Sequence, residues 1–339
     1  MQLADFDYDL PPELIAQTPL PDRDRCRLLV LHRQSGTVEH HRFDDLPGLL
    51  RPGDVLVMND SRVLPARLFG QKPTGGRVEI LLTRRQRPDA WLALVRPGLR
   101  PGQGIRFAED LVATVEEVRE DGQRLLRFDR SGAELDAAIH RIGTMPIPPY
   151  IREPLADPSA YQTVYAREEG SVAAPTAGLH FTPTLLDRLA GAGIELVFLT
   201  LHVGPGTFRP VKTPDPSQHH LDAEWYRLGP EAADRINRAR DEGRRIIAVG
   251  TTVVRTLESL ADDRGHVAPT EGETALFILP GHAFRCVDAM ITNFHLPRST
   301  LIMLVAAFAG RERILAAYRE AIALRYRFYS FGDAMLIED

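Results

Sequence analysis

The sequence predicts an α/β protein with a large layered domain around a mainly parallel sheet and an inserted small antiparallel β-barrel domain. Two observations support this. The second half alternates short apolar runs with helix-period segments, as in a parallel sheet covered by helices. From residue 66 to about residue 130, short apolar runs are separated by turn signals such as Gly75-Gly76 and Asp121-Gly122, which favours a small barrel. We therefore expect a discontinuous large domain, 1–65 and 145–339, and a barrel domain, 66–144.

Composition sets the broad class. The chain has 339 residues, 44% hydrophobic and 26% charged, which suits a globular protein of two domains. The acidic start lacks a basic signal-peptide region, and the longest apolar helical run is too short to span a bilayer. Cys26 and Cys286 are far apart, which favours a reducing compartment. We expect a cytoplasmic protein without membrane contact.

The net charge of −5 means that any RNA binding must come from local patches. The predicted barrel segment concentrates arginines that suit phosphate contacts, although a solvated charged surface explains them equally well. They are Arg84, Arg85, Arg87, Arg96, Arg100 and Arg106.

In the first half we expect a short helix at 13–17 and strands at 25–32 and 55–58. A helix is expected at 133–140. The proline-rich segment 145–154 cannot be a helix or a central strand, because proline lacks the backbone donor, so it forms the return linker.

The second half alternates strands and helices. Thr182 as N-cap and Pro183 as first residue begin a helix, and Gly191 and Gly193 end it. The other helices are expected at 230–242, 250–259, 299–309 and 311–324. The strands are expected at 194–203, 245–249, 275–279 and 287–291.

Polar residues follow four of the expected strands. In open α/β sheets, ligands bind beyond the carboxyl ends of the strands. One such end is usually just a turn, but four together indicate an enzyme. The residues are Asp60, Ser61 and Arg62 after the strand at 55–58, His202, Gly204 and Gly206 at the end of 194–203, Thr251 and Thr252 after 245–249, and Asn293, His295 and Ser299 after 287–291.

Further candidates lie in the segments between and after these strands. Arg255 follows Thr251 by one helical turn, which suits an anion, and Asp333 lies beside aromatic residues where a base or cation can stack. The remaining candidates are Thr176 and His180 in AAPTAGLHFT, Arg209 in LHVGPGTFRPV, and Glu224.

Simpler explanations exist for each of these residues. His180 and His295 adjoin phenylalanines and suit hydrogen-bonded core histidines as well as catalytic ones. The threonines can cap a helix, the glycines can make a tight turn, and Arg255 can form an ion pair. His220 and Glu224 are four residues apart but no third ligand is evident, so we expect no metal site. Gly204-Pro205-Gly206 is not a dinucleotide fingerprint, since Pro205 interrupts it.

Six segments, in order along essentially the whole chain, closely resemble the S-adenosylmethionine:tRNA ribosyltransferase-isomerase family of queuosine biosynthesis. They are NDSRVLPARL, AAPTAGLHFT, LHVGPGTFRPV, GTTVVRTLES, TNFHLPRSTL and YRFYSFGDAML. The resemblance implies transfer and isomerisation of the ribosyl part of S-adenosylmethionine onto 7-aminomethyl-7-deazaguanine at the tRNA wobble position. The products are epoxyqueuosine-tRNA, adenine and methionine. The resemblance also implies a large α/β domain with a barrel insertion and no metal or organic cofactor, and we expect a monomer.

Such a reaction needs a base, because the sulfonium acidifies the neighbouring 5′ C–H bonds, and an acid for departure of adenine. The candidates are His202, His180 and His295, then Asp60 and Glu224, and the sequence does not rank them. Arg62, Arg209 and Arg255 suit the methionine carboxylate or an RNA phosphate. The alternatives are an S-adenosylmethionine-dependent RNA methyltransferase, whose usual glycine loop is missing from this sequence, and a non-catalytic RNA-binding module.

Overall fold

The computed structural model describes residues 1–153, 155, 157–208, 211 and 213–339. They form two compact units. The larger contains Met1–Ser61, Pro149–Glu168 and Ala174–Asp339, and the smaller contains Arg62–Pro148 and Glu169–Ala173. The predicted class, an α/β protein with an inserted barrel, is confirmed. The domain limits 66–144 remain a prediction about independently folding segments.

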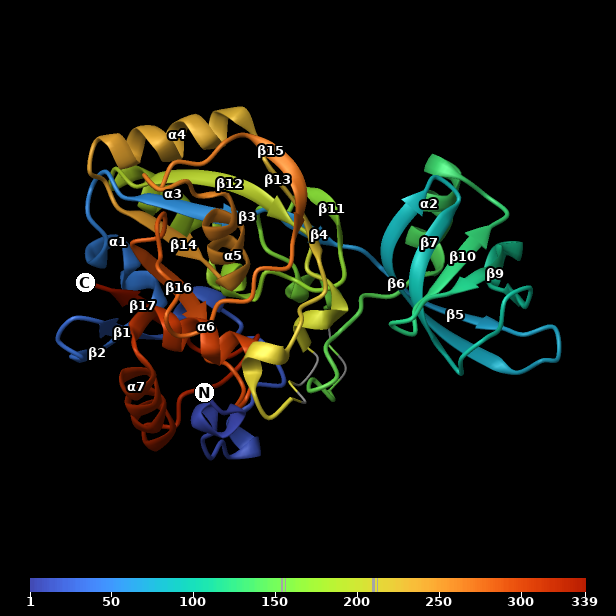
Figure 1. Cartoon of the computed structure of the whole chain (residues 1–339), viewed down its shortest axis with the longest axis horizontal. Coiled ribbons are helices and arrows are strands. Elements are labelled where there is room, and N and C mark those ends of the chain that lie inside the picture. The colour runs from blue at the N-terminus through green and yellow to red at the C-terminus, as the bar shows by residue number, and fades with distance from the viewer. Residues whose placement is uncertain (154, 156, 209–210, 212) are drawn as a thin grey trace. The chain divides into compact units, whose positions relative to one another are not determined.

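The larger unit is built on a nine-stranded sheet (Figure 1). Its strands in spatial order are β15 (Thr270–Thr274), β13 (Glu224–Leu228), β12 (Glu195–Leu201), β3 (Val55–Asn59), β14 (Ile246–Val249), β16 (Ala289–Asn293), β17 (Ala334–Glu338), β1 (Arg27–His32) and β2 (Val38–Arg42). The four strands from β12 to β16 are mutually parallel. β17 is parallel to β1 and antiparallel to β16, and the outer pairings are antiparallel. The sheet is therefore mixed, with its parallel part at the centre.

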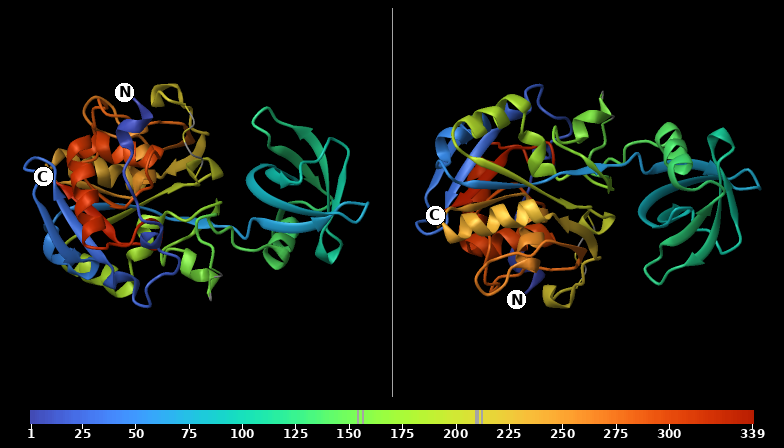
Figure 2. Two further views of the ribbon diagram at one scale, coloured as in Figure 1. Left: turned by 90° about the horizontal axis from the view of Figure 1, so that it is seen from below. Right: turned by 90° about the horizontal axis from the view of Figure 1, so that it is seen from above.

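Helices cover both faces of this sheet, with α3 on one side and α4 on the other (Figure 2). Alternate strand residues such as Leu56 and Met58 pack with Leu185 and Leu189 of α3. Thr182 caps α3 by accepting a hydrogen bond from the Leu185 N–H at 3.1 Å, as expected from the sequence. The helices are α1 (Leu46–Leu49), α3 (Pro183–Gly191), α4 (Pro230–Asp241), α5 (Thr251–Leu260), α6 (Thr300–Ala309) and α7 (Arg311–Ala323). Within the described ranges, every helix is too short or too polar to cross a membrane.

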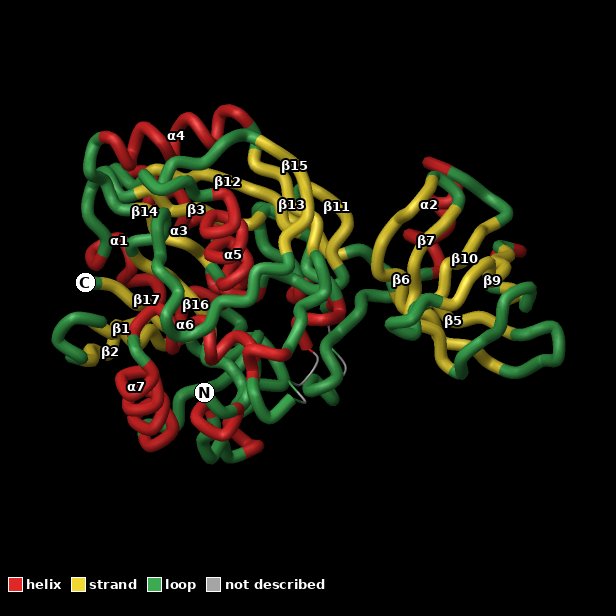
Figure 3. The backbone as a smooth tube through the Cα atoms, in the orientation of Figure 1, coloured by secondary structure: helices red, strands yellow, loops and turns green. Residues whose placement is uncertain are grey.

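The smaller unit is a closed antiparallel barrel, and strands make up most of it (Figure 3). Around the barrel the strands are β10 (Arg124–Phe128), β7 (Ala90–Arg96), β6 (Arg77–Arg87), β5 (Arg67–Gln71), β8 (Gly104–Arg106) and β9 (Val112–Val118). Buried side chains such as Leu68, Ile80 and Leu126 fill it, together with Leu135 and Ile139 from α2 (Gly132–Ile142). A separate two-stranded sheet is formed by β4 (Ser61–Val63) and β11 (Glu168–Ser171).

Two local predictions are wrong. The strand expected at 275–279 lies earlier, as β15 (Thr270–Thr274), because β13 pairs with those residues. The carbonyl of Leu276 instead accepts a hydrogen bond from Arg255 Nε at 2.9 Å. The helix expected at 13–17 is a single 3-10 turn, Pro12–Leu14, and Ile15 forms a β-bridge to Phe328.

Candidate active site

The four polar strand ends identified in the sequence follow β12, β3, β14 and β16, which are consecutive neighbours in the sheet. Because these strands are parallel, their carboxyl ends meet at one edge. His202 follows β12, Ser61 follows β3, Thr251 opens the helix after β14, and His295 follows β16. The structure thus brings together groups that are up to 234 residues apart (295 − 61).

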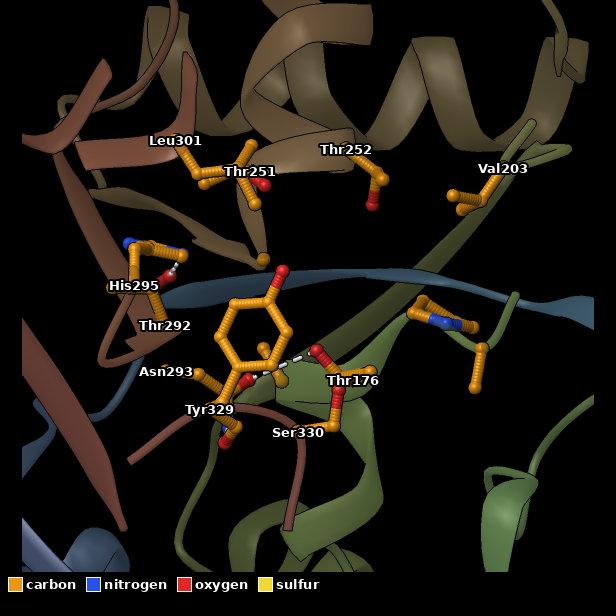
Figure 4. Close-up of a pocket in the computed structure, with 14 residues that line it drawn as sticks. Thr176, Val203, Thr251, Thr252, Thr292, Asn293, His295, Leu301, Tyr329 and Ser330 are labelled. Carbon is orange, nitrogen blue, oxygen red and sulfur yellow. Dashed lines mark hydrogen bonds between the residues drawn. The ribbon is translucent and has the colours of Figure 1, made fainter. Parts of the chain in front are cut away.

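A pocket lies at this edge and encloses about 530 Å³, part of it open to solvent (Figure 4). Five of the candidates from the sequence line it, namely Thr176, Thr251, Thr252, Asn293 and His295. Apolar and aromatic groups complete the wall, among them Val203, Leu301 and Tyr329. A mixed lining of this size and kind is typical of small-molecule sites.

Tyr329 was not among the site residues expected from the sequence, although its segment had been noted for aromatic stacking. Its ring points into the pocket (Figure 4). Its backbone has φ of 73°, a strained conformation for a bulky residue. Two hydrogen bonds support this conformation: the Tyr329 N–H donates to the Phe294 carbonyl at 3.1 Å, and the Tyr329 carbonyl accepts from Asn293 Nδ2 at 3.1 Å.

Asn293 joins the pocket to a buried chain of side chains. Its Oδ1 accepts a hydrogen bond from the Thr176 hydroxyl at 3.2 Å, and its Nδ2 donates to His180 Nε2 at 3.0 Å. The ring proton of His180 is therefore on Nδ1, which lies 3.3 Å from Cys26 Sγ. Burial lowers the pKa of His180 to about 3, so the ring is neutral. His180 lies behind the pocket wall and positions Asn293.

His202 has a different environment. Its Nδ1 lies 2.8 Å from the Ser61 hydroxyl oxygen, and its ring stacks on Trp225 with 4.8 Å between ring centroids. Burial lowers the pKa of His202 to about 4, with Glu168 opposing this shift. The imidazole is therefore neutral near pH 7 and able to accept a proton. The next residue, Val203, lines the pocket.

Asn59 is a further positioning residue that the sequence indicated only as part of a strand end. It is fully buried, and its Oδ1 accepts hydrogen bonds from the N–H groups of Ser61 and Leu201, both at 3.0 Å. Its Nδ2 donates to the Leu201 carbonyl at 2.9 Å and to the Thr252 hydroxyl at 3.3 Å. One amide thus holds the ends of β3 and β12 against the start of α5.

Glu224 and Arg255 form an ion pair, each side chain being 5% exposed. Glu224 also accepts a hydrogen bond from the Gly204 N–H at 2.8 Å. Asp60 accepts one from the Thr200 hydroxyl at 2.7 Å, and burial raises the pKa of Asp60. These three charged groups lie around the strand ends but do not line the pocket. They support its walls.

The other candidates have varied environments. The hydroxyl of Ser299 caps α6, and Asp333 pairs with Arg27 at 3.0 Å. His295 is buried in the pocket wall, and burial lowers its pKa to about 3. Arg62 lies in the smaller unit, half exposed and 3.5 Å from Glu169.

Two candidates remain, both from LHVGPGTFRPV. A side chain on Gly206 would meet Asp222, since an added Cβ would lie 2.6 Å from a carboxylate oxygen, so this position requires glycine. Arg209 lies outside the described residues.

No group of three histidine, cysteine, aspartate or glutamate residues suited to a metal ion occurs among the residues for which the structure gives positions. What the pocket offers instead is hydroxyls, amides, an aromatic ring and a neutral imidazole nearby. Together, fold and site define an α/β protein with a small-molecule pocket at the carboxyl edge of its sheet.

The chain belongs to the queuosine biosynthesis protein family, whose sequence model matches residues 3–337. It is 58% identical to the S-adenosylmethionine:tRNA ribosyltransferase-isomerase of Symbiobacterium thermophilum, over 99% of this chain and 100% of the relative. It is 56% identical to the protein of that name from Thermus thermophilus, over 99% of each. The crystal structure of S-adenosylmethionine tRNA ribosyltransferase from Thermotoga maritima is 42% identical, covers 98% of this chain and 99% of that chain, and has a TM-score of 0.56.

Proposed function

We propose that this protein is an S-adenosylmethionine:tRNA ribosyltransferase-isomerase. It transfers and isomerises the ribosyl group of S-adenosylmethionine onto 7-aminomethyl-7-deazaguanine at the tRNA wobble position and releases adenine and methionine. The observation that carries the proposal is the similarity along the whole chain to relatives that bear this name. The pocket at the carboxyl edge of the sheet gives it a physical basis.

In this proposal His202 is the general base. The sulfonium makes the adjacent 5′ C–H protons acidic, and a neutral imidazole is suited to remove one of them. His202 is neutral because its ring is buried, while Ser61 and Trp225 orient it. His180 and His295 are also neutral, but their partners Cys26, Asn293 and Thr292 hold them inside the protein. The structural surroundings therefore favour His202 among the three histidines.

The pocket wall divides the binding work. The ring of Tyr329 with Val203 and Leu301 suits a flat purine, for which stacking and apolar contact supply affinity. Thr176 and Asn293 suit ribose hydroxyls. Thr251 and Thr252 are the first residues of α5, where free backbone N–H groups favour a carboxylate such as that of methionine.

We further propose that the reaction uses no metal or organic cofactor, since S-adenosylmethionine is itself the activated substrate. We also propose that the protein acts as a cytoplasmic monomer. Light scattering of the purified protein tests the oligomeric state, and a dimer would contradict that part of the proposal.

The decisive experiment incubates the protein with S-adenosylmethionine and tRNA carrying the aminomethyl-deazaguanine base. We expect adenine release that depends on this base, with unmodified tRNA as the control. Formation of S-adenosylhomocysteine and methylated RNA would instead identify a methyltransferase. Binding of tRNA without turnover of S-adenosylmethionine would identify an RNA-binding module.

A further inference from the structure

The outer face of β5 in the barrel exposes an aromatic side chain. Phe69 is 51% exposed, whereas its neighbours Leu68 and Gly70 are buried and point into the barrel. Burying a phenylalanine side chain stabilises a fold by roughly 2 kcal/mol, and the barrel does not use this gain. A single exposed apolar residue is common, so its surroundings decide what it means.

Those surroundings are basic. Gln71 pairs with Arg77 of β6 on one side and with Arg106 of β8 on the other, so the three side chains form a row across three strands. Phe69 lies in the next row, opposite Glu79, which in turn is opposite Arg96 of β7. Side chains directly opposite are about 5 Å apart and diagonal neighbours about 7–8 Å. The ring of Phe69 is therefore surrounded by guanidinium groups on the same surface.

These guanidinium groups are available to a partner. Arg77, Arg96 and Arg106 are exposed and make no ion pair or side-chain hydrogen bond with any residue that the structure describes. By contrast, Arg85 pairs with Asp136, and Arg87 pairs with Glu116 at 2.6 Å. Arg67 and Glu79 largely neutralise each other at 3.3 Å. Unneutralised positive charge thus concentrates around Phe69.

We propose that this surface, which we call the Phe69 face (Phe69, Gln71, Arg77, Arg96 and Arg106), binds an unpaired stretch of the substrate tRNA. The inference rests on the proposed function, which makes tRNA a substrate. One base stacks on Phe69, and the arginines hold the flanking phosphates. Sequence-tolerant binding of single-stranded RNA uses this combination of an aromatic platform and a cationic border. A protein partner would need a wider apolar patch than one phenylalanine ring.

The test measures tRNA affinity at several salt concentrations, together with S-adenosylmethionine affinity and thermal unfolding. Phe69→Ala should weaken tRNA binding about tenfold, the usual size of one stacking contact. Phe69→Trp should retain it, and Phe69→Leu, which keeps apolar volume but has no aromatic face, should behave like Phe69→Ala. The double variant Arg77→Ala/Arg106→Ala should weaken binding and lower the salt slope by about two, one for each lost phosphate contact.

Two matched controls accompany these variants. Val118→Ala removes another exposed apolar side chain of the barrel, 40% exposed, and Arg188→Glu reverses an exposed charge in the larger unit. Both should retain tRNA affinity, and all variants should retain S-adenosylmethionine affinity.

Wild-type tRNA affinity in both Phe69→Ala and the double arginine variant would overturn the inference. A change of oligomeric state in Phe69→Ala with unchanged tRNA affinity would also overturn it, because the face would then contact protein. If the wild-type protein releases adenine while the variants bind tRNA normally, only this inference fails. If the wild-type protein neither binds tRNA nor releases adenine, the proposed function fails.

Discussion

The hydroxyl oxygen of Ser61 lies 2.8 Å from Nδ1 of His202, and this contact joins the ends of the neighbouring strands β3 and β12. Trp225 supports the same ring by stacking. The two contacts hold one edge of the imidazole and one of its faces. They leave Nε2 without a hydrogen-bond partner within the described part of the chain, and we propose this atom as the proton acceptor.

Replacing His202 should abolish proton transfer while keeping the fold. We expect His202→Ala to lower turnover about a hundredfold or more, the usual size of a general acid–base contribution. His202→Gln retains hydrogen bonding to Ser61 but cannot take up a proton, so it should be nearly as impaired. Adenine release under saturating substrates measures both variants. Near-normal turnover of His202→Gln would show that the residue only positions substrate.

The pH dependence of kcat/KM should reflect the low pKa of His202. Burial lowers that pKa to about 4, so the basic form is complete well below neutral pH. We therefore expect no loss attributable to this group between pH 8 and 6, and a decline as the pH falls toward about 4, where the ring takes up a proton. Adenine release across this range, with circular dichroism to verify folding at each pH, is the measurement. In His202→Gln the residual activity should lack this acidic limb.

Stability should fall with acidification because buried histidines are held neutral. The folded pKa values of His180 and His295 are about 3, below the value of about 6.5 in an unfolded chain. The unfolded state therefore binds more protons, and this contribution is complete above pH 6.5 and lost as the pH falls toward 3. Each histidine contributes a slope of about 1.4 kcal/mol per pH unit within that window. Urea unfolding between pH 7 and 4.5 measures it, and His180→Gln should remove about one proton from the slope.

Breaking the buried Arg255–Glu224 pair should destabilise the larger unit. Removing one partner leaves a buried charge uncompensated, so Arg255→Ala should cost about 3 kcal/mol or more. The control is Arg311→Ala, which breaks an exposed pair with Glu312 and should cost less than about 1 kcal/mol. Urea unfolding measures both. Unchanged stability combined with loss of S-adenosylmethionine binding would instead assign Arg255 a direct role in binding substrate.

Activity should survive exhaustive chelation, because the proposed base, stacking surface and hydroxyls are all groups of the protein itself. Adenine release is compared before and after dialysis against EDTA, with metal content measured in parallel. Loss of activity that one added metal restores would contradict the proposal. His219, His220 and Glu224 would then be the first residues to test.

The sequence alone determined the architecture and the edge at which the pocket lies. Strand–helix alternation implies parallel strands, and the carboxyl ends of parallel strands meet at one edge, so Ser61, His202, Thr251 and Asn293 had to converge. Helix signals such as Thr182 with Pro183 are equally local, because cap and first turn are adjacent in the chain.

The tertiary structure decided what each side chain does at that edge. Cys26 and His180 are 154 residues apart, and only their contact shows that His180 faces inward while His202 rests on Ser61. Folding likewise paired Arg255 with Glu224, brought Tyr329 into the pocket and placed β17 between β16 and β1. Desolvation and ion pairing depend on every group packed around a side chain, and most of those groups are distant in sequence.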